Sequence, residues 1–330
     1  MKRDLFLVTG ANGFIASNLV ELLVNEKKRV RAMVRDPQKA EIFAKWPVEI
    51  VIGDMKDKAS LRRAVEGVGG VYHMAAVYRQ SGLPEEEFIA VNTQGTKDLL
   101  DVSIEAGVER VVHCSTGGVL GHVNPVPGTD KSPYSPGDMY QRSKTEAEKI
   151  AIEYFRGGKI PGAIIRPAMV YGPGDTRHYK MFKMLQKGTF FYVGKGQAWC
   201  HFVDVRDLVR AFFLAMENED RSGEIYCVPG KEPRRLAAAV KEICRQLGVS
   251  EPWLHLPVVP MQVLGTICEV ICKPFGINPP IFRRRVDFFV KDRNFDRSKA
   301  EAELGYLPAQ DFSEEVRDMI TWYRAHGWLS

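Results

Sequence analysis

The chain has 330 residues, of which 45% are hydrophobic and 26% charged, and its formal net charge is +5. These values are typical of a globular protein with a sizeable core and exclude a disordered chain. The 46 basic residues are spread among 41 acidic ones, so nucleic acid is not expected as a partner. The six cysteines show neither disulfide nor metal-site spacing, which predicts a cytoplasmic location and no bound metal.

Apolar segments typical of strands alternate with helical segments through the first half of the chain. The expected strands cover 5–8, 30–34, 50–52, 70–74 and 110–115, and the expected helices cover 15–25, 60–65, 93–106 and 139–155. This alternation predicts an α/β protein with a Rossmann-type, doubly wound parallel sheet. The strands are short and apolar throughout, as expected of strands buried between two layers of helices.

The regular alternation ends after a further strand at 163–170. Downstream we expect a helix at 180–187, strands at 190–193 and 224–228, a return segment at 201–216, and helices at 236–247 and 313–326. These pieces predict a smaller, discontinuous C-terminal substrate lobe formed by 171–203 and 223–330. The NAD(P)-binding domain then comprises 1–170 and about 204–222. The cleft between them is expected at the carboxyl ends of the strands.

A glycine-spaced turn, Gly10-Ala11-Asn12-Gly13-Phe14-Ile15-Ala16, connects the first strand to the first helix. Glycines at this spacing let the backbone approach a pyrophosphate, and the helix N-terminus offers unpaired N–H groups to it. The position of the turn favours dinucleotide binding over a purely steric role. The candidate cofactor-binding residues in this turn are Gly10, Asn12, Gly13, Phe14 and Ile15.

The end of the second strand bears on the choice between NAD and NADP. An acidic residue at this place holds the ribose 2′-hydroxyl of NAD, but here Val34 and Arg35 stand there. A guanidinium pairs well with a 2′-phosphate, so Arg35 favours NADP. NAD remains the alternative because the carboxylate of Asp36 follows directly.

The third and fourth strands end in further candidates for the cofactor site. Asp54 and Met55 offer a carboxylate and an apolar side chain to an adenine. Ala75 and Ala76 keep the end of the fourth strand small beside the phosphates. All four positions lie at the edge of the sheet where the glycine turn is expected.

Tyr140 and Lys144 lie four residues apart in an expected helix and therefore project from one face. An ammonium beside a phenol favours the phenolate and lowers the tyrosine pKa from its ordinary value of about 10. The pair can then exchange a proton with an alcohol or a carbonyl oxygen. Ser115 and Thr116, at the end of the fifth strand, place hydroxyls where that oxygen needs a second hydrogen bond.

Motifs along nearly the whole chain resemble those of extended short-chain dehydrogenases/reductases, in order and in spacing. They are TGANGFIAS, GDM, HMAAV, CSTGGVLG, YQRSK, RPAMVYGPGD, HFVDVRDL and FDRSKAEAELGYLP. The resemblance implies that Tyr140 is the acid/base and that Lys144 holds the nicotinamide ribose. It also implies a catalytic hydroxyl at Thr116, with Ser115 as the neighbouring candidate.

The same resemblance implies cofactor contacts from Pro167 and Val170 and a homodimer. Within the superfamily, the chain is most similar to the 3β-hydroxysteroid dehydrogenase and dihydroflavonol reductase-like branch. Nucleotide-sugar enzymes typically carry an asparagine where this chain has Met169 and an arginine where it has Cys200. Without these two groups a nucleotide diphosphate would be poorly held. A dehydratase would also carry an Asp-Glu pair where Gly117 and Gly118 follow the catalytic hydroxyl.

We therefore expect an NAD(P)-dependent oxidoreductase that interconverts a secondary alcohol and a ketone on a largely apolar, sterol-like or polycyclic small molecule. One alternative is a nucleotide-sugar 4-epimerase with tightly bound NAD, for which Arg177 or residues 283–285 would supply the diphosphate contacts. A second alternative is a non-catalytic protein that senses NADP. Such a sensor has no use for an activated phenol, so the pair Tyr140 and Lys144 argues against it.

The tail contains an apolar segment at 256–272. Together with Met169 and Cys200, this segment is expected to line an apolar pocket on the substrate side of the cleft. The alternatives are that it rests on a membrane surface or forms a buried helix of the second lobe. Pro257, Pro260 and Gly265 interrupt its amphipathic pattern, which leaves the three interpretations open.

Overall fold

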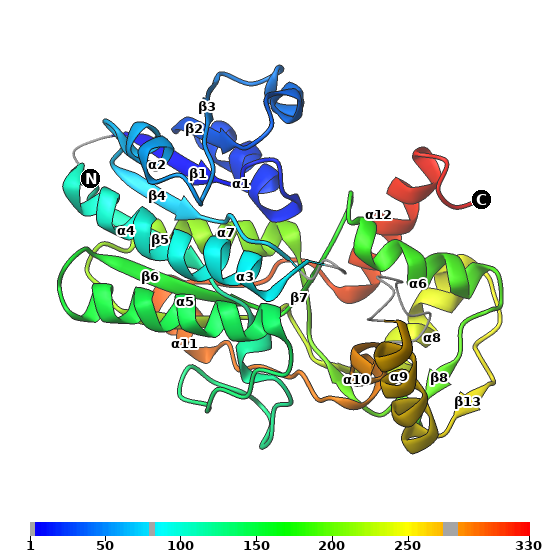
Figure 1. Cartoon of the computed structure of the whole chain (residues 1–330). Coiled ribbons are helices and arrows are strands. Elements are labelled where there is room, and N and C mark those ends of the chain that lie inside the picture. The colour runs from blue at the N-terminus through cyan, green and yellow to red at the C-terminus, as the bar shows by residue number, and fades with distance from the viewer. Residues whose placement is uncertain (1–3, 79–82, 273–282) are drawn as a thin grey trace.

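The computed structural model describes residues 4–78, 83–272 and 283–330. A sheet of seven parallel strands, in the order β11-β6-β5-β4-β1-β2-β3, forms its centre (Figure 1). The strands are β1 (Leu5–Thr9), β2 (Arg29–Val34), β3 (Val48–Ile52), β4 (Gly70–His73), β5 (Arg110–Cys114), β6 (Gly162–Pro167) and β11 (Glu224–Val228). The strand order reverses between β1 and β4, which opens a crevice at the carboxyl ends of these two strands.

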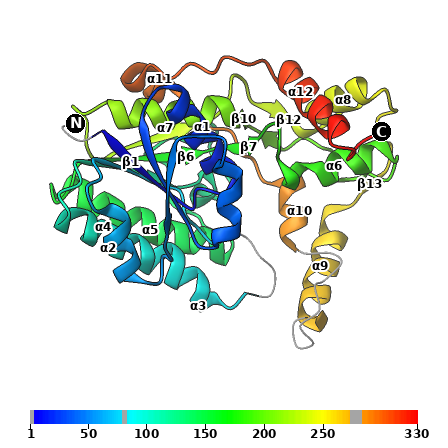
Figure 2. The ribbon, with the colours of Figure 1, turned by 90° about the horizontal axis from the view of Figure 1, so that it is seen from above.

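Helices cover both faces of this sheet, so each face has its own apolar core. One layer contains α2 (Lys58–Val65), α4 (Gly95–Glu105) and α5 (Met139–Arg156), and the opposite layer contains α1 (Phe14–Asn25), α7 (Val205–Glu217) and α11 (Ser298–Leu304) (Figure 2). A short helix α3 (Glu85–Phe88) continues into a π-helical turn, Ile89–Gln94, ahead of α4. The expected helix at 93–106 therefore begins earlier than its apolar pattern indicates.

The second lobe packs α6 (Thr176–Gln186), α8 (Leu236–Leu247) and α12 (Phe312–Ala325) around a separate apolar core. Three pairs of short strands complete it: β7 (Met169–Tyr171) with β10 (Phe202–Asp204), β9 (Trp199–Cys200) with β12 (Arg234–Arg235), and β8 (Tyr192–Val193) with β13 (His255–Leu256). Helices α9 (Val258–Cys272) and α10 (Arg283–Val290) extend from this lobe. The predicted fold class, a doubly wound parallel sheet with a smaller C-terminal lobe, is confirmed.

The structure corrects three details of the sequence prediction. The expected strand at 163–170 divides after Pro167, and the Met169 N–H bonds instead to the His201 carbonyl at 2.9 Å. The strand at 224–228, which we placed in the substrate lobe, pairs with β6 at the edge of the central sheet. β3 is an edge strand with Ile50 and Ile52 exposed, so it is not buried on both faces. The rest of the predicted domain division stays a prediction.

Among the described residues, no helix combines the length and the apolar character that crossing a bilayer requires.

Candidate active site

A cavity of about 450 Å³ lies where the carboxyl ends of β1, β5 and β6 meet the second lobe. Many of the predicted site residues line it: Gly10, Gly13, Phe14, Ile15, Ala76, Ser115, Thr116, Tyr140, Lys144, Pro167 and Val170. The sheet and α5 thus bring the glycine turn, the predicted hydroxyls and the tyrosine–lysine pair to one cavity. This juxtaposition is the geometry that hydride transfer beside a proton donor requires.

The glycine turn has the backbone that a dinucleotide needs. Gly10 adopts a left-handed φ of 62°, and a Cβ there would lie 2.8 Å from the Ala75 Cα, so only glycine fits. Gly13 caps α1 without a side-chain hydrogen bond, and the first turn of the helix contains no acidic residue. The N–H groups at this end are therefore open to a phosphate, and no carboxylate in that turn repels it.

A buried network behind the turn fixes the ends of β1 and β4, and sequence reasoning missed it. The Thr9 hydroxyl accepts hydrogen bonds from the N–H groups of Met74 and Ala75, both at 3.0 Å, and lies 3.0 Å from His73 Nδ1. The other ring nitrogen of His73 lies 2.8 Å from the Thr96 hydroxyl. Burial, with a smaller effect from Lys144, lowers the pKa of His73 to about 3, so the ring is neutral.

Tyr140 and Lys144 lie in the first two turns of α5. Asp138 caps the N-terminus of this helix, and its carboxylate accepts a hydrogen bond from the Gln141 N–H at 2.8 Å. The Tyr140 ring meets the Tyr78 ring edge to face, with their centroids 5.0 Å apart. Lys144 is 2% exposed, and burial lowers its pKa, while Cys114 and Glu148 act in the opposite direction. An ammonium in this position favours the phenolate of the neighbouring tyrosine.

The two predicted hydroxyls differ in their partners. Ser115 is buried and donates a hydrogen bond to the Glu148 carboxylate. Thr116 is half-buried, and its hydroxyl accepts a hydrogen bond from the Gly118 N–H at 3.1 Å. Since an accepted bond leaves the Thr116 proton available for donation, Thr116 fits the substrate-facing role better than Ser115.

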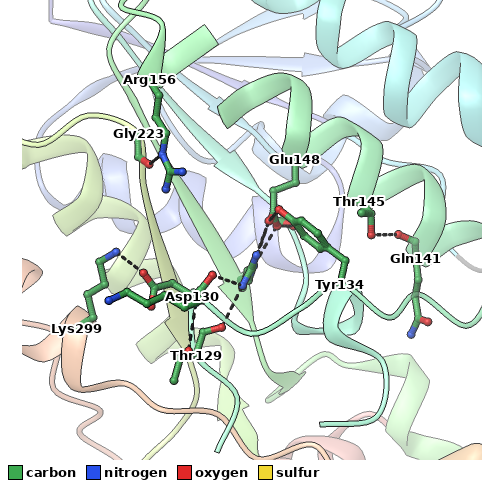
Figure 3. Close-up of polar contacts among 12 residues, drawn as sticks. Thr129, Asp130, Tyr134, Gln141, Thr145, Glu148, Arg156, Gly223 and Lys299 are labelled. Carbon is green, nitrogen blue, oxygen red and sulfur yellow. Dashed lines mark hydrogen bonds and ion pairs between the residues drawn. The ribbon is translucent and has the colours of Figure 1, made fainter. Parts of the chain in front are cut away.

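Glu148 and Arg166 form a fully buried ion pair that anchors α5 to β6. The Arg166 guanidinium lies 2.6 Å from the carboxylate, and the side chains are 1% and 0% exposed. Tyr134 donates a further hydrogen bond to Glu148 at 2.7 Å (Figure 3). Arg166 also donates to the Thr129 carbonyl at 3.2 Å. The network therefore fixes the helix that carries the catalytic candidates, and no local sequence pattern marks this pairing.

Asp175, Arg177 and His178, at the start of α6, form a second cluster of polar side chains that lines the cavity. The Asp175 carboxylate accepts hydrogen bonds from Arg177 Nε at 2.9 Å and from His178 Nδ1 at 2.5 Å. Burial raises the pKa of Asp175, but the hydrogen bond and charge of His178 and the charge of Arg177 outweigh it and hold that pKa well below its usual range. Arg177 also lies over the Phe14 and Tyr78 rings, at 5.4 and 5.6 Å from their centroids.

Several predicted residues lie outside the cavity lining. Asn12 and Arg35 are exposed, and the Asp36 carboxylate caps the turn after β2 by accepting a hydrogen bond from the Gln38 N–H at 3.0 Å. Asp54 likewise accepts from the N–H of residue 56 at 2.9 Å. Met55 is buried against helix α4 rather than presented to a ligand. Ala75 also lies outside the cavity lining and packs against Gly10.

Two substrate-side expectations are wrong. Cys200 is fully buried in the core of the second lobe and does not reach the cavity. No part of 256–272 that the structure describes lines the cavity, and Val259, Val263, Ile267 and Ile271 of α9 are exposed. The described side chains of this segment therefore form neither a wall of this cavity nor a buried helix. The side chains of residues 283–285 lie outside the described part of the chain.

Comparison with known proteins identifies the family. Residues 6–228 match the model of the NAD dependent epimerase/dehydratase family, which is more than half of the chain. The chain belongs to this family, and the predicted membership of the extended short-chain dehydrogenases/reductases is confirmed. It is therefore an NAD(P)-dependent enzyme that acts on CH–OH groups.

Similarity to individual relatives extends over the whole chain. Sterol demethylase protein B of Methylococcus capsulatus is 30% identical over 98% of this chain and 99% of its own length. The 3β-hydroxysteroid-dehydrogenase/decarboxylase isoform 1 of Arabidopsis thaliana is 28% identical over 95% of this chain and 78% of its own length.

Solved structures support the same assignment. The crystal structure of gox2253 superposes with a TM-score of 0.85 at 30% identity and covers 99% of this chain and 100% of that one. DesIV, a dTDP-glucose 4,6-dehydratase from Streptomyces venezuelae with NAD bound, gives a TM-score of 0.79 at 26% identity, and 99% of each chain is covered.

Glu148→Ala leaves the Arg166 guanidinium buried without its partner, which typically costs about 3–5 kcal/mol of the free energy of unfolding. Urea denaturation followed by circular dichroism measures this loss. The control is Glu146→Ala on the same helix, which removes an exposed ion pair with Lys149 and is expected to cost less than about 1 kcal/mol. Equal losses in the two variants would show that the buried pair does not anchor α5.

Proposed function

We propose that the enzyme interconverts a secondary alcohol and a ketone on a largely apolar, sterol-like or polycyclic substrate. The observation that carries this proposal is the cavity itself, which Tyr140, Lys144 and Thr116 line together with Gly10 and Gly13 of the glycine turn. The relatives named for sterol chemistry support the apolar class of substrate.

Each group of residues at the site has its own role in the proposed reaction. Gly10, Gly13 and the open N-terminus of α1 fit the pyrophosphate of a nicotinamide cofactor, which accepts or donates the hydride when it is bound. Tyr140 exchanges a proton with the substrate oxygen, and Thr116 donates a hydrogen bond that orients the same oxygen. Lys144 favours the phenolate and holds the ribose beside it.

The proposed preference for an apolar substrate rests on apolar side chains that line the cavity. Met169 and Phe295 are two of them, and their apolar surface stabilises a bound hydrocarbon through removal of that hydrocarbon from water. The epimerase alternative draws support from Arg177, which also lines the cavity. However, Nε of this guanidinium already binds Asp175 and Nη2 binds the Val170 carbonyl at 3.1 Å, so a diphosphate would have to displace these partners.

NADP is the proposed cofactor, with NAD as the alternative. Arg35 is exposed at the end of β2, where a 2′-phosphate would lie. Asp36, which would have to turn toward a ribose to favour NAD, is committed to capping the following turn. Both observations support the guanidinium as the group that meets the cofactor.

The apolar stripe on α9 supports contact with a membrane surface. Val259, Val263, Ile267 and Ile271 follow one another at intervals of four residues, and their exposed fractions are 68%, 53%, 48% and 58%. Figure 2 shows that α9 extends away from the body of the molecule, so a flat surface can reach this stripe. We propose that the stripe enters the interface of a lipid bilayer, from which an apolar substrate is drawn. The homodimer and the cytoplasmic location stay predictions.

Tyr140→Phe removes the ionisable hydroxyl and keeps the ring, so kcat for oxidation of a sterol-like alcohol should fall by about 100-fold or more. The change in NADPH fluorescence measures turnover and cofactor affinity, and the affinity should stay nearly constant. Tyr179→Phe is the matched control because it removes a phenol outside the cavity lining and should leave kcat unchanged.

A near-normal kcat in Tyr140→Phe contradicts the assignment of the acid/base. Formation of a 4-epimer from a UDP-sugar without net reduction of cofactor, together with NAD that persists through gel filtration, favours the epimerase instead.

Arg35→Ala should weaken NADPH binding by about 1.5–3 kcal/mol, because a charge-assisted contact to the 2′-phosphate is lost, and should leave NADH binding nearly unchanged. Calorimetric titration with each cofactor measures both affinities. The control is Lys39→Ala, which removes an exposed positive charge four residues further along the chain. Equal losses for NADPH and NADH would refute the NADP assignment.

Val263→Asp combined with Ile267→Asp should reduce co-sedimentation with phosphatidylcholine vesicles by about tenfold or more, because each introduced carboxylate must stay hydrated. The matched control changes two exposed apolar residues elsewhere, Ile42→Asp and Leu307→Asp, and should sediment like the wild type. Absence of wild-type protein from the vesicle pellet would contradict the membrane proposal.

If the wild type elutes from gel filtration as a dimer and the α9 variant elutes as a monomer, the stripe contacts a second copy of the chain instead.

A further inference from the structure

The segment between α10 and α11 crosses from the second lobe to the sheet domain. We call residues 291–297 the strap. On the sheet side it bonds to the loop after β5, with Val123 N–H to the Asp292 carbonyl at 2.9 Å and Gly128 N–H to the Asn294 carbonyl at 2.8 Å. On the lobe side the Arg293 N–H bonds to the carbonyl of β9 residue Trp199 at 2.8 Å. Figures 1 and 2 show this crossing between the two halves. The strap is thus fixed from both sides.

Phe295 lies in the middle of the strap and is 5% exposed. Phe295 lines the active-site cavity and also lines an outer hollow of about 330 Å³. The other residues around the hollow are Pro127, His201, Pro233, Asn294, Asp296, Arg297, Ser298 and Glu301. Among the described residues, Phe295 is therefore the one that lines both the inner cavity and the outer hollow.

The contact between Phe295 and Gly117 explains why no side chain follows Thr116. A Cβ at Gly117 would lie 2.6 Å from Phe295 Cζ and 3.0 Å from the Pro167 carbonyl oxygen. The ring thus occupies the space that a side chain at position 117 would need. This space adjoins Thr116, which is the predicted hydrogen-bond donor to the substrate oxygen. The Phe295 ring therefore lies where a dehydratase would be expected to carry an acidic side chain.

We propose that Phe295 is a specificity-determining residue, which sets how far an apolar substrate extends past Thr116 by separating the inner cavity from the outer hollow. The proposal rests on the proposed function. The ring packs against Val119, Leu120 and Val123, and the strap that carries it is fixed by backbone hydrogen bonds on both sides, so displacement of the ring by a bulky substrate would break these packing contacts. Removal of the ring joins the two spaces and admits a longer ring system.

The test compares secondary alcohols of increasing size, namely 1-phenylethanol, 1-(naphthyl)ethanol and 1-(pyrenyl)ethanol, with NADP as the oxidant. In Phe295→Ala the ratio of kcat/KM for the pyrenyl alcohol to that for the phenyl alcohol should rise about tenfold or more. Phe295→Leu retains more of the apolar volume and should give an intermediate ratio. The control is Phe288→Ala, which removes a lobe aromatic that lines neither space and should keep the wild-type ratio.

An unchanged ratio in both Phe295 variants overturns the proposal. Thermal unfolding shows whether Phe295→Ala still folds. If it does not, the ratio measured for Phe295→Leu alone tests the proposal. If the wild type oxidises none of the alcohols, the proposed function fails separately. The affinities for the same naphthyl and pyrenyl alcohols, measured from their fluorescence, then decide the role of Phe295. A higher affinity for the pyrenyl alcohol alone in the variant supports this role. An equal change in affinity for both alcohols refutes it.

Discussion

The site depends on the ion pair between Glu148 and Arg166, which holds α5 against β6. Removal of two charges from water is costly, and the pair repays this cost because the surrounding donors satisfy nearly every lone pair of the carboxylate. Glu148 lies one helical turn beyond Lys144 and two turns beyond Tyr140, so the anchor, the ammonium and the phenol share one face of the helix. The same carboxylate accepts a hydrogen bond from Ser115, which is why we assign the proposed contact with the substrate to Thr116.

The sequence predicted those parts of the protein whose physics is local. The glycine turn was predictable because a positive φ at Gly10 and an open helix N-terminus demand particular residues at a fixed spacing. The Tyr140 and Lys144 pair was predictable because four residues make about one turn of helix. The alternation of strands and helices likewise predicted the central sheet, but not the residues at which its strands and helices begin and end.

The parts that the sequence did not predict depend on pairs far apart in the chain. Glu148 meets Arg166 across 18 residues, and Phe295 meets Gly117 across far more, with no local pattern to mark either contact. Cys200 was misplaced because motif spacing gives the position of a residue but not the face of the short strand on which it lies. The segment 256–272 was ambiguous because an apolar helix gives the same pattern whether its partner is protein or lipid.

The electrostatics around Lys144 connect the fold to the chemistry. Two buried histidines, His73 and His113, lie near it, and burial together with the lysine charge lowers the pKa of each. Their rings therefore stay neutral at physiological pH and add no positive charge that would compete with the ammonium. Burial lowers the pKa of Lys144, whereas Cys114 and Glu148 act to raise it. Arg177 is a second cation whose charge interacts with Tyr140. Because Glu148 is also the anchor of α5, one carboxylate both holds this helix against β6 and acts to keep Lys144 charged.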